Sequence, residues 1–129
     1  MAIWQYEMRL TFSLTTERQE LSHQVSEILP ESTSWHAKLR IWGKDPGDTI
    51  EMWDDCESPE LWVRVDLREP NPEFLRAVLS LAERLGGRLA TEYSDPLEPT
   101  VGKVLEDIAK SDAFRFVCDP QKFLSGLDE

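Results

Sequence analysis

Two segments far apart in the chain alternate strictly between apolar and polar side chains, and this pattern constrains the fold more than any other feature. In residues 4–12 the apolar side chains occupy the even positions, and in residues 61–68 they occupy the odd positions, with Trp62 on the polar side. A period of two is typical of a β-strand that buries one face. The two segments therefore predict a sheet with one buried face and one polar face.

A first helix is expected after the N-terminal strand. Thr16 followed by Gln19 fits a capping box, and Pro30 lies just past the expected end of the helix. The positions expected to form its buried stripe are Leu21, Val25 and Ile28.

Two further helices have clear boundary signals. Residues 71–73, Asn-Pro-Glu, combine an N-cap residue, a proline at the first helical position and an acidic first turn, and residues 86–87, Gly-Gly, predict the end of that helix. Pro99 and Thr100 are expected to open the third helix. The apolar positions expected to be buried are Phe74, Leu75, Val78, Leu79, Ala82 and Leu85 in the second helix, and Val101, Val104, Leu105 and Ile108 in the third.

Residues 36–42 and 49–55 flank a loop rich in turn-forming residues, which predicts a β-hairpin. We expect Trp42 to lie opposite Thr49, because this register matches the chemistry of the paired side chains on both faces. The expected pairs are Ile41–Ile50 and Leu39–Met52 on one face, and Arg40–Glu51, Lys38–Trp53 and His36–Asp55 on the other.

The expected order is β-α-β-β-β-α-β-α, with residues 88–93 as the fifth strand. This order predicts one α+β domain over residues 1–129, with a mostly antiparallel five-stranded sheet of ferredoxin-like type and helices packed on one face. Residues 111–129 are expected to form a C-terminal extension that packs on the domain. In this extension we expect a short extended piece with Phe114, Phe116 and Val117, and a helical turn from residue 119 that buries Phe123, Leu124 and Leu127.

Charge restricts the partners that the chain can bind. The sequence has 25 acidic and 14 basic residues and a net charge of −11. Such a surface repels phosphate groups, so we expect no binding to nucleic acid or membranes and favour a basic protein partner. The N-terminal strand pattern is unlike a signal peptide and no apolar run is long enough for a membrane helix, so a cytoplasmic location is expected. Cys56 and Cys118 are expected to stay reduced.

The sequence contains no recognisable catalytic motif, and we therefore expect a protein that is not an enzyme and uses no cofactor or metal. One alternative is a small enzyme or ligand-binding protein with a pocket near His36, whose imidazole would face Asp55 in the expected hairpin and could act as a base. The carboxylates of residues 51–60 leave two other readings open, a site for a hard cation and an acid–base pair.

The polar side of the sheet is the candidate interaction surface. The chain has five tryptophans, and tryptophan and arginine together are typical of binding hot spots. The predicted partner-binding residues are Trp42, Trp53, Asp54, Asp55, Glu57, Trp62, Arg64 and Arg68. Two alternatives to a partner-binding surface remain open. The C-terminal extension covers this face, or a second copy of the chain covers it in a homodimer.

Residues 61–82, LWVRVDLREPNPEFLRAVLSLA, and residues 111–124, SDAFRFVCDPQKFL, resemble a group of small uncharacterised bacterial proteins. Proteins of this size and acidity are associated with immunity to secreted polymorphic toxins. The resemblance implies a bacterial cytoplasmic protein and favours a protein-inhibitor role, and it assigns no site residues. Together with the acidic surface, it favours an immunity-type inhibitor of a basic partner such as a toxin nuclease.

Overall fold

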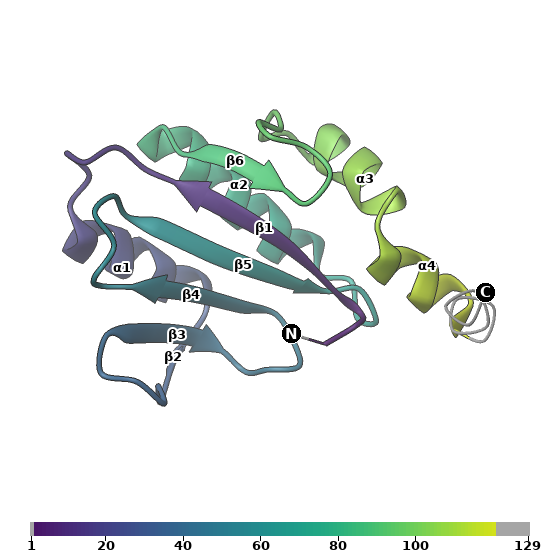
Figure 1. The fold of residues 1–129 in the computed structure, drawn as a ribbon, viewed down its shortest axis with the longest axis horizontal. Coiled ribbons are helices and arrows are strands. Elements are labelled where there is room, and N and C mark those ends of the chain that lie inside the picture. The colour runs from purple at the N-terminus through teal and green to yellow at the C-terminus, as the bar shows by residue number, and fades with distance from the viewer. Residues whose placement is uncertain (1, 121–129) are drawn as a thin grey trace.

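A six-stranded antiparallel sheet with the strand order β2-β3-β4-β5-β1-β6 forms the centre of the protein (Figure 1). The computed structural model describes residues 2–120. Its strands are β1 (Gln5–Thr11), β2 (Glu31–Ser32), β3 (Leu39–Gly43), β4 (Thr49–Trp53), β5 (Glu60–Asp66) and β6 (Arg88–Thr91). The α+β class is confirmed. The predicted five-stranded sheet is one strand short, because the two residues of β2 are too few to show a period.

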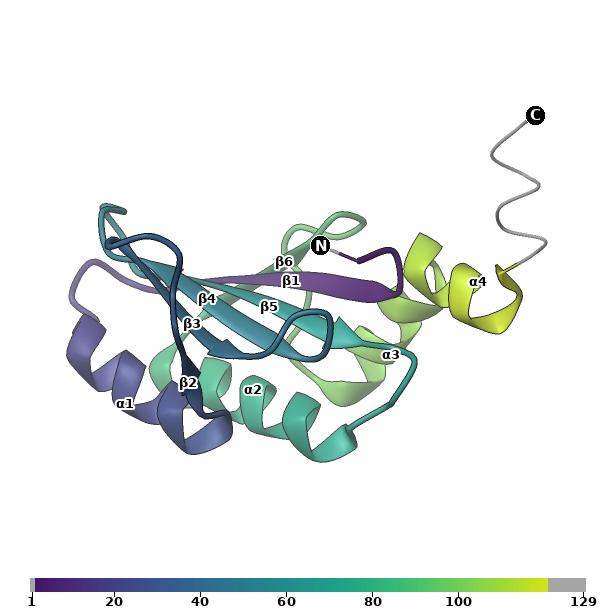
Figure 2. The ribbon, with the colours of Figure 1, turned by 90° about the horizontal axis from the view of Figure 1, so that it is seen from below.

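Three helices cover one face of the sheet, and Figure 2 shows that no helix formed by residues 2–120 lies on the opposite face. The three helices that cover the sheet are α1 (Arg18–Ile28), α2 (Pro72–Leu85) and α3 (Val101–Ala109), and a fourth helix is α4 (Asp112–Cys118). The fourth lies beyond one end of the sheet, near the start of β1. One broad face of the sheet is therefore left for other contacts.

The alternation predicted for the two long strands is confirmed. In β1 the side chains of Tyr6, Met8 and Leu10 are at most 3% exposed, and Met8 lies opposite Val63 of the neighbouring β5. Burial of these side chains against the helices supplies the main favourable free energy of folding. The odd positions of β1 consequently point to the helix-free face.

The signals at the ends of α2 are also confirmed. The Asn71 side chain accepts a hydrogen bond from the backbone N–H of Phe74 at 3.2 Å, and Gly86 ends the helix with a φ of 67°. The capping box predicted for α1 is wrong. This helix begins at Arg18, and its N-cap residue, Glu17, makes no side-chain capping hydrogen bond.

The predicted register of the hairpin is wrong by one residue. Trp42 lies opposite Ile50, and the observed pairs are Leu39–Trp53, Arg40–Met52, Ile41–Glu51 and Gly43–Thr49. Trp42 therefore faces the helices, where it is fully buried and its indole Nε1 donates a hydrogen bond to the Ser26 hydroxyl of α1 at 3.0 Å. A buried tryptophan contributes about 3–5 kcal/mol, which exceeds the roughly 0–1 kcal/mol of each exposed ion pair in the predicted register.

The extended piece predicted near the C-terminus is wrong as well. Phe114, Phe116 and Val117 belong to α4, whose N-cap residue Ser111 accepts a hydrogen bond from the Phe114 N–H at 3.1 Å. Ser111 followed by Asp112 is a strong helix start, and this local signal outweighs the strand preference of the aromatic side chains. The predictions for Phe123, Leu124 and Leu127 lie outside the described residues.

Candidate functional site

The helix-free face of the sheet carries an ion-pair network centred on Arg64 of β5. Its Nε lies 3.0 Å from Glu7 Oε2 on β1, and its Nη1 lies 2.7 Å from Glu51 Oε1 on β4. The Arg64 side chain is only 20% exposed. Burial alone would lower the pKa of Arg64, but the two carboxylates outweigh burial and raise it. One arginine thus bridges the carboxylates of both neighbouring strands.

A cavity of about 490 Å³ lies beside this network. Residues of β1, β5 and β6 line it, together with adjoining residues that include the start of α4. Arg9 and Trp62 line it, and the guanidinium carbon of Arg9 is 5.7 Å from the centre of the Trp62 ring. The Nε of Arg9 is buried and has no hydrogen-bond partner among the described residues 2–120. His36 is not among the residues that line this cavity.

A cluster of three aromatic rings lies toward the β3–β4 side of the sheet. The ring centres of Trp35 and Trp53 are 5.8 Å apart in an edge-on arrangement, and His36 lies 5.2 Å from Trp53. Trp35 is 74% exposed, although Trp53 is half-buried. The rings of the three residues, which we call the aromatic cluster, therefore present a large apolar group directly to solvent.

The hairpin geometry contradicts the predicted facing of His36 and Asp55. Strand β3 begins only at Leu39, which lies opposite Trp53, so His36 precedes the paired segment. The Nδ1 of His36 accepts a hydrogen bond from the Lys38 N–H at 3.0 Å, and its ring packs on tryptophan. The imidazole is thus engaged in the aromatic cluster.

The loop between β4 and β5 carries the three acidic residues that we call the acidic loop: Asp54, Asp55 and Glu57, all exposed. Arg18 of α1 holds the backbone of this loop, because its guanidinium donates to the carbonyl oxygens of Trp53 at 3.4 Å, of Cys56, and of Glu57 at 3.3 Å. The loop directly follows Trp53. Its carboxylates therefore lie next to the aromatic cluster on an anchored backbone.

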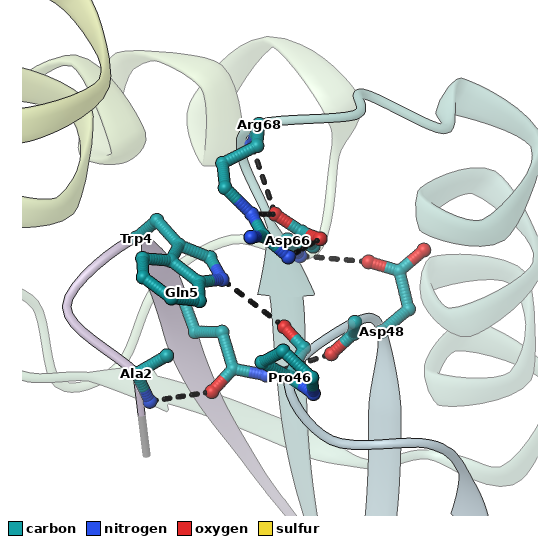
Figure 3. A network of polar contacts seen from close by, with 8 residues as sticks. Ala2, Trp4, Gln5, Pro46, Asp48, Asp66 and Arg68 are labelled. Carbon is teal, nitrogen blue, oxygen red and sulfur yellow. Dashed lines mark hydrogen bonds and ion pairs between the residues drawn. The ribbon is translucent and has the colours of Figure 1, made fainter.

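Arg68 belongs to a separate network at the end of β5 (Figure 3). Its guanidinium lies 4.0 Å from the centre of the Trp4 ring and pairs with Asp66 at 3.0 Å, which lowers the pKa of the Asp66 carboxyl. Asp48 accepts the Asp66 N–H at 2.7 Å, and burial raises the pKa of Asp48. Trp4 in turn donates to the Pro46 carbonyl oxygen at 3.2 Å. The network joins the N-terminal segment to the β3–β4 loop.

The structure separates the predicted site residues into four groups. Trp53 and the acidic loop belong with the aromatic cluster, Trp62 lines the cavity, Arg64 forms the central ion pairs and Arg68 holds Trp4. The placement of Trp42 on the polar face is wrong, because this side chain is fully buried. Sequence reasoning missed Trp35 and Arg9. The only signal for Trp35 was a tryptophan within a segment that shows no strand or helix period.

The fold is an α+β domain in which residues 2–120 place no helix on one face of the sheet. Comparison with protein-family models, with curated proteins and with solved structures found no match to this chain. Within residues 2–120 no helix is long and apolar enough to span a membrane. No three His, Cys, Asp or Glu side chains in that same part of the chain are arranged to hold a metal ion.

Proposed function

We propose that this protein is a non-enzymatic binding module that docks a basic protein through the aromatic cluster and the acidic loop. The observation that carries the proposal is the 74% exposure of Trp35, held edge-on against Trp53. Exposing a tryptophan to water forgoes about 1.5–3 kcal/mol that its burial would contribute. A partner that covers Trp35 recovers this free energy, and tryptophan is the residue type most enriched among hot spots.

Charge supports a basic partner. The acidic loop contributes three exposed carboxylates beside the tryptophans, on a chain whose net charge is −11. Opposite charges steer two proteins together and raise the association rate, while the buried aromatic anchors slow dissociation. In one interface the acidic loop would therefore speed association, and the aromatic cluster would slow dissociation.

An immunity-type inhibitor fits this combination of acidic residues and aromatic anchors best. A nuclease binds phosphate groups in a positively charged cleft, and an acidic surface with aromatic anchors is complementary to such a cleft. The resemblance of residues 61–82 and 111–124 to immunity-associated bacterial proteins points in the same direction.

The sheet order supports the idea that one part of the docking surface, Trp35 and His36, was added to a common core. We infer a ferredoxin-like core in which β4, β5, β1 and β6 are adjacent in that order, and β2 and β3 are inserted between α1 and β4. Trp35 and His36 lie in the inserted segment between β2 and β3.

The test compares the protein with matched variants. The immobilised protein is incubated with lysate of the organism that encodes it, and the affinity of each captured protein is then measured by calorimetry. We expect a basic protein whose affinity falls at least tenfold in Trp35→Ala, which is about 1.4 kcal/mol, and also falls in Asp54→Asn/Asp55→Asn. The control with the same charge change is Glu73→Gln/Glu83→Gln on α2, which should bind like the unchanged protein.

Three results would contradict the proposal. The first is a captured partner whose affinity does not change in either surface variant. The second is capture only of acidic proteins. The third is a solution mass of two chains that falls to one in Trp35→Ala, because this result assigns the aromatic cluster to a homodimer interface.

A further inference from the structure

Three side chains that line the cavity beside the Arg64 network form a row across the helix-free face. Arg9 of β1 lies opposite Trp62 of β5 on one side and opposite Ala90 of β6 on the other. All three line the cavity. Because Ala90 has only a methyl group, it leaves the space beside Arg9 unfilled. The hollow thus follows directly from the strand register and the size of one side chain.

Arg9 has no acidic partner in this hollow. The nearest candidate on its own strand is Glu7, which Arg64 engages together with Glu51. Within residues 2–120 Arg9 forms no ion pair, and its buried Nε has no hydrogen-bond acceptor. Because Arg9 lines the cavity, an anion that enters can pair with its guanidinium.

The walls of the cavity suit an apolar body. Trp62 forms one wall and Tyr93 another, and the Tyr93 hydroxyl is fixed because it accepts a hydrogen bond from the Asp112 N–H at 3.1 Å. The volume of about 490 Å³ lies within the range of about 300–1,000 Å³ that small-molecule sites occupy.

The acidic residues of the lining leave the charge of Arg9 available. Glu7 is paired with Arg64, and Asp112 is paired with Arg115 of α4. Glu92 also lines the cavity and is exposed to solvent, where its charge is screened. An anionic group that enters beside Arg9 therefore meets a cation in a sheltered place.

We propose that this cavity binds a small organic carboxylate with an apolar body. The carboxylate accepts hydrogen bonds from the Arg9 guanidinium where it faces the cavity, because guanidinium and carboxylate match in shape and charge. The apolar body packs between Trp62 and Tyr93. This site lies on the β1–β6 side of the sheet, away from the aromatic cluster, and it does not depend on the proposed function.

The test uses a pair of probes that differ in charge. 3-Phenylpropionate and phenethylamine carry the same ring on a two-carbon chain, one with a carboxylate and the other with an ammonium group. Binding at millimolar concentration is followed by calorimetry and by ligand-observed NMR. We expect 3-phenylpropionate to bind and phenethylamine not to bind.

Variants then locate the site. Arg9→Gln should weaken binding of 3-phenylpropionate at least tenfold, which is about 1.4 kcal/mol, whereas Arg9→Lys should retain part of it. Ala90→Leu should abolish binding because the larger side chain fills the hollow. Trp35→Ala should leave binding unchanged, and this variant separates the inference from the proposed docking surface. Circular dichroism checks that each variant is folded.

The inference fails if neither probe binds to the unchanged protein, a result that depends on no variant. It also fails if phenethylamine binds as well as the carboxylate, because the acidic lining would then determine the ligand. Binding of 3-phenylpropionate that persists in folded Arg9→Gln and Ala90→Leu would place the ligand elsewhere and would overturn the assignment.

Discussion

Asp107 is the residue on which most polar contacts between the sheet and α3 converge. Its carboxylate accepts hydrogen bonds from the hydroxyl groups of Tyr6, of Thr91 at 2.7 Å and of Ser94 at 2.8 Å, and the residue is 1% exposed. Burial would raise the pKa of Asp107, but the three hydroxyl donors outweigh burial and lower it. The donors come from β1, from β6 and from the loop after β6, so one buried charge joins three segments.

Replacing Tyr6 by phenylalanine should change how stability depends on alkaline pH. Burial and the hydrogen bond to Asp107 raise the pKa of Tyr6 far above its usual value. A raised pKa contributes stability below the unfolded-state pKa of about 10, and the contribution is lost as the pH rises above it, by about 1.4 kcal/mol per pH unit. At pH 7 we expect Tyr6→Phe to lower the free energy of unfolding by about 1–2 kcal/mol, and this deficit should shrink above pH 10. Urea unfolding of both proteins across this range measures the difference.

Thr91→Val provides the matched control for Tyr6. It removes another donor to the same carboxylate but no group that titrates in this range, so its deficit should stay constant with pH. A deficit of Tyr6→Phe that is equally constant between neutral and alkaline pH would contradict the raised pKa of Tyr6.

At the scale of elements, the β3–β4 hairpin depends on the backbone of Gly43. This residue has a φ of 81° and pairs with Thr49, so it forms the last pair before the loop. A Cβ at this position would collide with the carbonyl oxygen of Asp48. Glycine is therefore needed at this position both for its conformation and for the close approach of the two strands.

Gly43→Ala should cost far more stability than Gly86→Ala. Gly86, at the end of α2, also has a positive φ of 67°, but a Cβ there meets no atom within 4 Å. We expect Gly86→Ala to lower the free energy of unfolding by about 1 kcal/mol through conformational strain alone. Gly43→Ala adds the collision with Asp48 and should cost more than about 2 kcal/mol. Chemical denaturation of the two variants tests this difference, and equal losses would show that the hairpin tolerates displacement of the Asp48 backbone.

The elements that the sequence predicted correctly are those specified by local patterns. The alternation in β1 and β5 and the Asn71 and Gly86 signals of α2 each depend on a few neighbouring residues. The hairpin register depended instead on whether α1 offers a partner to Trp42, and this is a tertiary contact. A one-residue shift moves every side chain of a strand to the other face. For this reason the error in register also misplaced Trp42.

The candidate site was predictable to a similar extent. The strand period placed Trp62 and Arg64 on the polar face of the sheet, and the structure places both on the helix-free face. Trp35 and Arg9 were missed for another reason. The exposure of Trp35, and the absence of a hydrogen-bond partner for Arg9 Nε within residues 2–120, result from how distant segments meet. Single-sequence patterns do not report such contacts.

At the scale of the whole molecule, acidic residues outnumber basic residues, and the acids therefore cannot all have a basic residue of their own to pair with. Arg64 is a largely buried arginine held by two carboxylates, while many of the remaining acids are spread over the surface of a chain with a net charge of −11. Such a surplus of one sign repels itself and disfavours the compact state. At 0.1 M salt, exposed charges more than about 10 Å apart are largely screened from each other, whereas partly buried pairs are screened much less. Added salt should therefore remove more repulsion than attraction.

We expect the free energy of unfolding to rise when sodium chloride is raised from about 0.01 M to 0.3 M, because the Debye length shortens from about 30 Å to less than 10 Å. Urea unfolding at the two salt concentrations measures the change, and chloride keeps effects specific to strongly excluded anions small. Glu83→Lys replaces an exposed acid in the last turn of α2 and makes the net charge less negative. This variant should be more stable than the unchanged protein at low salt and should respond less to added salt. A fall in stability with salt in the unchanged protein would mean that ion pairs such as Arg64 with Glu7 and Glu51 outweigh the repulsion among the surface acids.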